Sequence, residues 1–299
     1  MLTCFSHNKS EYQCMLYILE IFKTIYSLQN EVVVLFSDMT KAKLEQRPSM
    51  QLGKQDFLDM VLASPNTILL TVQKQSKVIL VNTESGQVLS EIVLKEKPRF
   101  LSMISANLAA TTFSNKTIQF IQVNETTLMA DSITNVDVKL YGIASYSNNL
   151  VVSYHPPGVR IITKVGRTIR NLDNTTTGRE VFKEPRWITT TYDGSIYVTD
   201  WGTHEITRMD SNLTILQTLY GDMLKGPHGI ISLNRDHLLV CSFRIDSIVL
   251  IRPSNSSMKV LLDKPSGTDR PRYICFCKEQ KKLYVAPKHT GTILIYKLS

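Results

Sequence analysis

Short apolar runs separated by turn residues recur along most of this chain, and residues 182–230 give the clearest example. Runs at 186–191, 195–199, 205–209 and 214–220 are rich in β-branched and aromatic residues. Between them lie triplets such as Tyr-Asp-Gly and Asp-Ser-Asn, which favour tight turns. Four short strands joined by tight turns are typical of one blade of a β-propeller.

The same unit repeats along the chain, as two independent series of positions show. An apolar residue of the third run recurs at intervals of 40 to 47 residues, and the residue that opens the first run recurs at intervals of 42 to 45. The first series is Val78, Ile118, Val159, Ile206, Ile248 and Ile293, and the second is Asp56, Arg99, Tyr141, Arg186, His228 and Arg272. Both spacings match a four-stranded blade of about 40–50 residues. The sequence therefore predicts an all-β, six-bladed β-propeller with antiparallel blades. An all-β sandwich is the weaker alternative, because its strands are not expected to keep the same positions in register.

The sixth unit, which begins at Arg272, provides three runs in place of four. An open strand edge promotes aggregation, so we expect the outer strand of this blade to come from the N-terminal side, within 31–53. The apolar run Glu-Val-Val-Val-Leu-Phe at 31–36 is the preferred candidate, and Ser-Met-Gln-Leu-Gly-Lys at 49–54 is the alternative. The propeller is thus expected to span 31–299.

The first 30 residues have a different pattern, which predicts a short amphipathic α-helix at 10–28. Ser10 and Gln13 fit a capping box, and Met15, Ile18, Phe22 and Ile25 follow the spacing of a coiled-coil seam. Two heptads are too short to hold a coiled coil alone. The helix is therefore either the end of a longer coiled coil, through which the chain would oligomerise, or a helix that lies on the propeller.

Composition and cysteine usage favour a cytoplasmic location. No apolar run approaches the roughly 18 residues of a membrane span, and the N-terminus lacks the features of a signal peptide. The cysteines are Cys4, Cys14, Cys241, Cys275 and Cys277, an odd number without paired spacing, which predicts reduced thiols. Six Asn-x-Ser/Thr sequons argue for secretion, but turns select the same residue types.

The strongest candidate site is the set of six residues that open the first runs. The first strand of a propeller blade is innermost, so Asp56, Arg99, Tyr141, Arg186, His228 and Arg272 are expected to circle one mouth of the central channel. Three arginines and a histidine there would bind an anionic group, such as an acidic side chain, a C-terminal carboxylate or a phosphate. The alternative is that each residue pairs with a loop carboxylate. The net charge of +8 favours acidic partners modestly.

Other residues with notable chemistry have structural explanations. Phe57, Phe100, Trp187 and Tyr273 follow mouth residues directly, and strand alternation predicts that they face the other way, into the core. Cys275 and Cys277 are expected to be core residues. The sequence has no phosphate-binding Gly-rich loop, nucleophile elbow or His-Glu-x-x-His motif, so we expect no catalytic residue, cofactor or metal.

Several repeated motifs resemble those of one known family. They are Gly142-Ile143 and Gly229-Ile230 in first strands, Ile196–Asp200 in a second strand, Ile206–Asp210 in a third strand, and the terminal Ile293–Leu298. Together they resemble the NHL-type six-bladed propeller at the C-terminus of tripartite-motif proteins. In that family the propeller recognises a protein partner or an RNA stem-loop, and a RING domain transfers ubiquitin. This sequence contains no Cys/His constellation of a RING or B-box, so the resemblance implies a recognition module without ligase activity.

The leading functional prediction is a non-catalytic interaction propeller that binds an acidic protein segment or RNA at the basic channel mouth, with no membrane partner. The alternative from another class is a calcium-dependent lactonase-like or esterase-like hydrolase. Calcium takes about six to eight oxygen ligands, whereas the predicted mouth offers one carboxylate, Asp56. A third interpretation is a scaffold that binds its partner through outer loops, especially Asn171 to Gly178.

Overall fold

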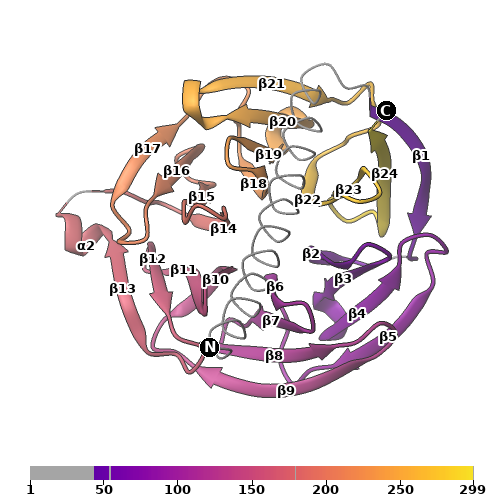
Figure 1. The fold of residues 1–299 in the computed structure, drawn as a ribbon, viewed down its shortest axis with the longest axis horizontal. Helices are drawn as coiled ribbons and strands as arrows, with labels where there is room; N and C mark the ends of the chain where they lie inside the picture. The colour runs from indigo at the N-terminus through magenta and orange to yellow at the C-terminus, as the bar shows by residue number, and fades with distance from the viewer. Residues whose placement is uncertain (1–43, 54, 179, 299) are drawn as a thin grey trace, which may run out of the picture. The chain divides into compact units, whose positions relative to one another are not determined.

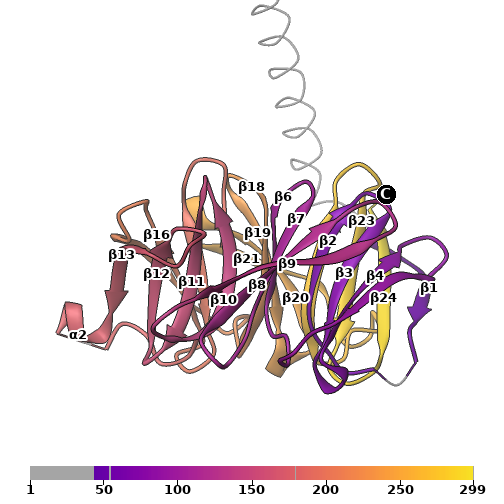
Figure 2. The same cartoon turned by 90° about the horizontal axis from the view of Figure 1, so that it is seen from below.

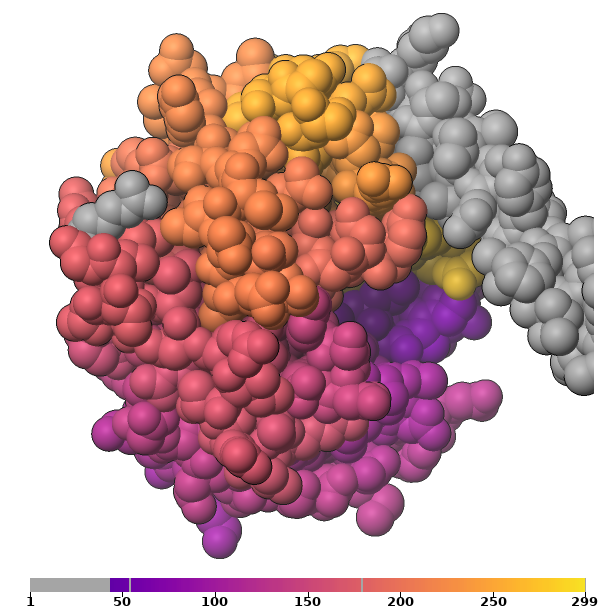
Figure 3. Space-filling view, turned by 60° about the vertical axis from the view of Figure 1, so that its left-hand side comes forward, coloured from indigo at the N-terminus to yellow at the C-terminus, as the bar shows by residue number. Residues whose placement is uncertain are grey.

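The computed structural model describes residues 44–53, 55–178 and 180–298, and these form six four-stranded antiparallel sheets arranged in a ring (Figure 1). This confirms the predicted all-β, six-bladed propeller. Figure 2 shows the ring from the side, with the strands running between its two faces. In Figure 3 the colours follow one another around the surface in chain order, as expected when each blade is a local unit.

The first strands of the six blades are innermost, and each blade adds its later strands outwards. The first strands are β2 (Phe57–Ser64), β6 (Leu101–Ser105), β10 (Lys139–Tyr146), β14 (Pro185–Thr190), β18 (Pro227–Asn234) and β22 (Pro271–Cys277). The second strands are β3 (Thr67–Val72), β7 (Leu108–Thr112), β11 (Asn149–His155), β15 (Ile196–Asp200), β19 (His237–Ser242) and β23 (Lys282–Pro287). The third strands are β4 (Lys77–Asn82), β8 (Thr117–Val123), β12 (Gly158–Ile162), β16 (Glu205–Met209), β20 (Ser247–Arg252) and β24 (Thr292–Leu298). The outer strands are β5 (Val88–Val93), β9 (Leu128–Asn135), β13 (Thr168–Asp173), β17 (Ile215–Leu219), β21 (Ser257–Leu262) and β1 (Leu44–Gln51).

Contacts between neighbouring first strands close the ring. Each first strand contacts the first strand of the next blade, and β22 contacts β2 in the same way. Second and third strands are mostly buried, because both of their faces pack against adjacent blades. The core therefore lies between the sheets and around the channel.

The sixth blade is completed by β1 from the N-terminal side, which confirms the predicted mode of closure. The preferred segment was wrong, because β1 pairs antiparallel with β24 from Leu44 opposite Leu298 to Gln51 opposite Thr292. This strand overlaps the alternative segment, 49–54, whereas 31–36 lies outside the described residues. An outermost strand needs little apolar surface, and β1 is mostly exposed, so hydrophobicity was a poor guide. Pro48 sits at a register shift of β1, where no ladder hydrogen bond is lost.

Two further predictions concern local structure. The helix expected at 10–28 lies outside the described residues. The segment Asn171 to Gly178 differs from the predicted loop, because β13 extends to Asp173 and a short helix, α2 (Asn174–Thr177), follows. The Asp173 carboxylate accepts a hydrogen bond from the Thr176 backbone in a capping box, which holds this segment in an ordered turn.

Candidate binding site at the channel mouth

The six predicted site residues lie where the innermost strands begin. Asp56 and Arg99 stand just before β2 and β6, and the other four stand within the first three residues of their strands. Three arginines belong to a repeated Pro-Arg-aromatic tripeptide, at 98–100, 185–187 and 271–273, in the second, fourth and sixth blades. We call this end of the channel, marked by Arg99, Arg186 and Arg272, the arginine mouth.

Two of these arginines share one aromatic ring. The guanidinium carbon of Arg99 lies 4.9 Å from the centre of the Tyr141 ring, and that of Arg186 lies 5.7 Å from the same centre. Cation–π attraction holds both side chains in place. Burial lowers the pKa of Arg99, and the positive charge of Arg186 lowers it further, while Tyr141 opposes both effects. Two like charges are thus held close together in a partly desolvated place, which an anion would stabilise.

The charges at the mouth are only partly compensated. Arg186 Nη2 donates to Glu184 Oε2 at 2.8 Å, and the one carboxylate of the predicted ring, Asp56, is bonded to His289 Nδ1 at 2.6 Å. Among the described residues, no carboxylate pairs with Arg99 or with Arg272, whose guanidinium lies 5.4 Å from the Tyr273 ring centre. Within the described part of the chain, the arginine mouth therefore has positive charge without a carboxylate partner.

His228 differs from the prediction, because it does not present a charge at the mouth. Its side chain is buried between Trp187, Trp201 and Phe243, with ring centres 4.5 to 4.7 Å away. Burial lowers the pKa of His228 to about 3, with a further decrease from nearby cations such as Arg272, although the Gly226 carbonyl opposes the change. His228 is therefore neutral at physiological pH and belongs to the aromatic packing of blades four and five.

Hydroxyl groups on second strands position the mouth backbone. Thr71 Oγ1 donates to the Arg99 carbonyl at 3.0 Å, Thr112 Oγ1 to the Tyr141 carbonyl at 2.9 Å, and Ser153 Oγ to the Arg186 carbonyl at 2.9 Å. Each bond joins one blade to the next. Sequence reasoning missed these residues, although a hydroxyl near the end of successive second runs was a visible signal.

Ser153→Ala should lower the free energy of unfolding by about 2 kcal/mol, because two buried backbone groups would lose their partner. Ser153 Oγ accepts from the Gly142 N–H at 2.8 Å while it donates to the Arg186 carbonyl. Chemical denaturation measures the change, and Ser105→Ala, at an exposed serine, is the control. Equal stabilities of the two variants would contradict the proposed stabilising role of the Ser153 hydrogen bonds.

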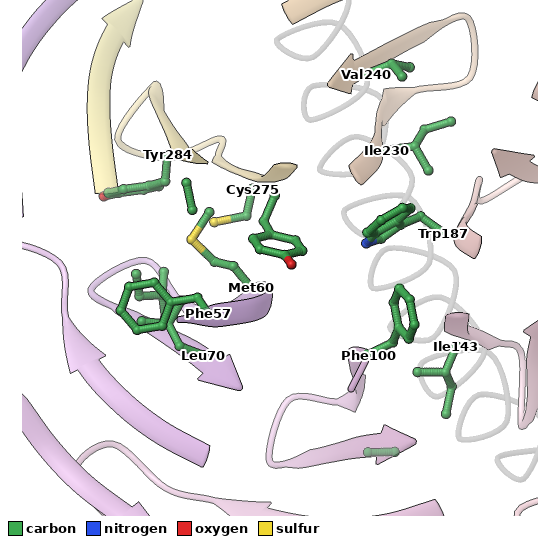
Figure 4. Packing of buried hydrophobic residues seen from close by; sticks show 14 of the residues in the cluster. Phe57, Met60, Leu70, Phe100, Ile143, Trp187, Ile230, Val240, Cys275 and Tyr284 are labelled. Carbon is green, nitrogen blue, oxygen red and sulfur yellow. The ribbon is translucent and has the colours of Figure 1, made fainter. Parts of the chain in front are cut away.

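Aromatic side chains close the channel beneath the mouth. The Phe100 and Trp187 ring centres lie 5.2 Å apart, and those of Trp187 and Tyr273 lie 6.3 Å apart. Their blades are not adjacent, so these rings can meet only near the channel axis, where Figure 4 shows Phe100 beside Trp187. We call Phe100, Trp187 and Tyr273 the aromatic plug.

The expectation that these four aromatic residues are buried was confirmed, but the predicted direction was wrong for the three plug residues. Register shifts occur at the start of first strands, between Pro185 and Ile188 and between Pro271 and Tyr273. Such irregularities interrupt the strand alternation on which the prediction for Trp187 and Tyr273 rested. Phe100 precedes β6, so strand alternation does not apply to it. Phe57, by contrast, lies beside Leu70 in the first blade (Figure 4).

Asp59 is a charged residue that sequence reasoning missed. It is 7% exposed, and its two oxygens accept the Met60 N–H at 2.9 Å and the Leu101 N–H at 2.8 Å. Burial raises the pKa of Asp59 to about 7. The two backbone hydrogen bonds, the nearby Trp187 side chain and the positive charge of Arg272 each oppose that rise. The Trp187 Nε1–H is buried and acts on the Asp59 carboxylate, but it forms no hydrogen bond of good geometry. Its position as a carboxylate within an otherwise apolar first run could have identified Asp59.

Metal-binding groups and cysteine thiols are two further kinds of candidate chemistry in the described residues. These residues contain no group of three or more His, Cys, Asp or Glu side chains that could hold a metal ion. Cys241, Cys275 and Cys277 are buried free thiols, as expected for core cysteines. None of the helices in the described part of the chain is long and apolar enough to cross a membrane.

Comparisons with known proteins identify the fold. No family model matches the sequence, and no curated protein does. Among solved structures, virginiamycin B lyase from Staphylococcus aureus, in a catalytically inactive form with quinupristin, is similar with a TM-score of 0.60 at 16% identity. The match covers 86% of this chain and 100% of the lyase chain. A protein of unknown function from Desulfotomaculum acetoxidans is similar with a TM-score of 0.56 at 13% identity, over 74% of this chain and 73% of that one. At these identities the likeness establishes the propeller fold alone.

Proposed function

We propose that this chain is a non-catalytic recognition propeller that binds an acidic protein segment at the arginine mouth. The observation that carries this proposal is the convergence of three arginines from alternate blades, two of which have no carboxylate partner among the described residues. The resemblance to the propellers of tripartite-motif proteins supports a role in substrate recognition. A cytoplasmic location and oligomerisation through 10–28 are further parts of the proposal, and the buried free thiols support the former.

The arginines suit a carboxylate because they are already ordered. Stacking on Tyr141 and Tyr273 restricts the Arg99 and Arg272 side chains before any ligand arrives, so less conformational entropy is lost on binding. The flat guanidinium group matches the two oxygens of a carboxylate. A Glu or Asp side chain, or a C-terminal carboxylate, is therefore the group that the arginine mouth fits.

A protein ligand is favoured over RNA by the arrangement of the aromatic rings. Binding of single-stranded RNA depends on exposed aromatic faces on which bases stack. At this mouth the Tyr141 ring contacts two guanidinium groups, and the plug rings are buried. Cationic groups continue across the fifth blade, where Arg244 lies 4.8 Å from the Trp201 ring centre and 3.2 Å from His204. An acidic segment that enters the mouth could extend over this surface.

The calcium-hydrolase alternative gains no support from this geometry. Its metal would need several oxygen ligands at the mouth, but the single carboxylate of the predicted ring, Asp56, is bonded to His289. Metal-dependent turnover of a lactone or ester by the purified chain would revive this alternative.

Reversing two mouth charges should abolish recognition. We expect Arg186→Glu with Arg272→Glu to weaken binding of a Glu-rich peptide at least ~100-fold, because two attractive contacts become repulsive. Fluorescence anisotropy of a labelled octaglutamate measures the dissociation constant, at low and moderate salt. A labelled single-stranded RNA is titrated in parallel.

The matched control is Arg167→Glu with Arg235→Glu, which changes the net charge equally at exposed turns on the opposite face. This control should bind like the parent chain. If both double variants lose the same affinity for the peptide, binding depends on nonspecific charge attraction. If the mouth variant still binds the peptide, the binding site lies on the outer loops. Tighter, mouth-dependent binding of the RNA would overturn the choice of a protein ligand.

A further inference from the structure

The part of the channel beyond the aromatic plug forms a separate cavity of about 210 Å³. Residues from all six innermost strands line it, but none of the six mouth residues does. Its half-buried lining residues, such as Met103, Ser145 and Thr190, lie farther along their strands, toward the opposite face. We call this cavity, which extends from Phe100 and Trp187 past Asp59 to those residues, the lower chamber.

The wall of the lower chamber contains one charged group. Among the lining residues only Asp59 is ionisable. Two backbone N–H groups donate hydrogen bonds to its carboxylate, which fixes the position of the side chain without neutralising its charge. The hydroxyl groups of the wall are occupied within the protein: Ser145 Oγ and Thr190 Oγ1 both donate to backbone carbonyls. Most of the remaining lining is aliphatic, with Ile143 and Ile230 as examples (Figure 4).

The closed end of the lower chamber is aromatic. Phe100 and Trp187 are 2% and 5% exposed, and both line the cavity. The buried Nε1–H of Trp187 acts on the Asp59 carboxylate without forming a hydrogen bond of good geometry. Aromatic rings attract cations through their negative faces, and a nearby positive charge favours the ionised form of a buried carboxylate.

We propose that the lower chamber binds a small organic cation, with its ammonium group at Asp59 and its apolar body against Trp187, Phe100 and the aliphatic wall. This site is distinct from the anionic site at the arginine mouth, because none of the six mouth residues lines the lower chamber. An apolar cavity of about 150 Å³ holds benzene in another protein, so a volume of about 210 Å³ suits a ring with a short amine.

Benzylamine is a suitable probe, and benzyl alcohol is its neutral match. We expect benzylamine to bind the 299-residue chain at least ten times more tightly than benzyl alcohol, by isothermal titration calorimetry at pH 8. In a ¹⁵N-labelled chain the Trp187 indole N–H signal should shift on titration. This signal reports from inside the chamber, whereas binding at an outer surface would leave it unchanged.

Asp59→Asn tests the role of the charge. This variant should bind benzylamine at least ten times more weakly and benzyl alcohol unchanged, whereas Asp131→Asn, the same substitution on exposed strand β9, should bind both like the parent.

The pH dependence of binding by the parent chain is a second measurement, which remains decisive if Asp59→Asn does not fold. The titratable groups that interact with Asp59 are Arg272, Tyr273, Cys241 and Cys275. Burial raises the pKa values of Tyr273 and of both thiols, and the ammonium group of benzylamine keeps its proton throughout the range from pH 6 to pH 8. Asp59, with its pKa of about 7, is thus the group that ionises between pH 6 and pH 8, and benzylamine affinity should rise several-fold over that range.

Three results would overturn the proposal: equal affinities for the amine and the alcohol, an unshifted Trp187 signal, or an amine affinity independent of pH between 6 and 8. None of them bears on peptide binding at the arginine mouth, so the two proposals can fail separately.

Discussion

Trp187→Ala is expected to lower the free energy of unfolding by about 4 kcal/mol, because truncation of a large buried aromatic residue leaves a cavity that its neighbours cannot fill. Trp187 contacts Phe100, Tyr273 and His228, which come from three other blades. Removing it therefore weakens the packing between blades at the channel axis. Urea denaturation followed by circular dichroism measures the loss.

Two further variants sharpen this prediction. Trp187→Phe keeps an aromatic ring in the plug and should lose markedly less stability than the alanine variant. Tyr192→Ala removes an aromatic side chain that is 77% exposed, so it should change the free energy of unfolding by less than about 0.5 kcal/mol. A Trp187→Ala chain as stable as the Tyr192→Ala control would show that the plug does not stabilise the ring.

Gly142→Ala is expected to cost about 3 kcal/mol, the upper part of the range for a forced steric overlap in a core. A Cβ atom at residue 142 would lie 1.9 Å from the Arg186 carbonyl oxygen. That oxygen cannot easily retreat, because Ser153 Oγ donates a hydrogen bond to it. Either β10 or β14 must move, which would also displace Arg186 at the mouth.

Gly178→Ala separates this overlap from the general effect of replacing glycine. Nothing lies within 4 Å of a Cβ at residue 178, but its φ of +65° disfavours alanine, so a loss of about 1 kcal/mol is expected. Thermal and urea denaturation of both variants give the comparison. The steric explanation fails if the two glycines respond equally. It is supported if Gly142→Ala also weakens binding of the Glu-rich peptide while Gly178→Ala leaves it unchanged.

The repeat could be predicted from the sequence because each blade is a local unit. In five of the six blades the four strands are consecutive in the chain, so the spacing of apolar runs and turns records the architecture directly. Closure of the ring was also predictable, since the sixth unit lacked a strand. The identity of the closing strand was not, because β1 is an exposed edge whose pairing with β24 joins the two ends of the described chain.

The candidate site was predictable in part. The spacing of first runs identified Arg99, Tyr141 and Arg186 as residues at one end of the channel, and they lie around a single ring there. The sequence did not reveal that His228 is buried and neutral, because that depends on Trp201 and Phe243, which approach it from the turns between second and third strands.

The sequence by itself determined the class of fold, the number of blades, the manner of closure and the positions at which basic residues open the inner strands. These properties follow from local periodicity, because similar repeats place apolar runs and turns at regular intervals along the sequence. Only the tertiary structure decided which way the side chains of the aromatic plug point and which hydroxyl groups form hydrogen bonds to the next blade. It also decided that Asp59 lies in the wall of a cavity. Each of these depends on contacts between different blades or on a register shift at the start of a strand, and neither leaves a periodic signal in the sequence.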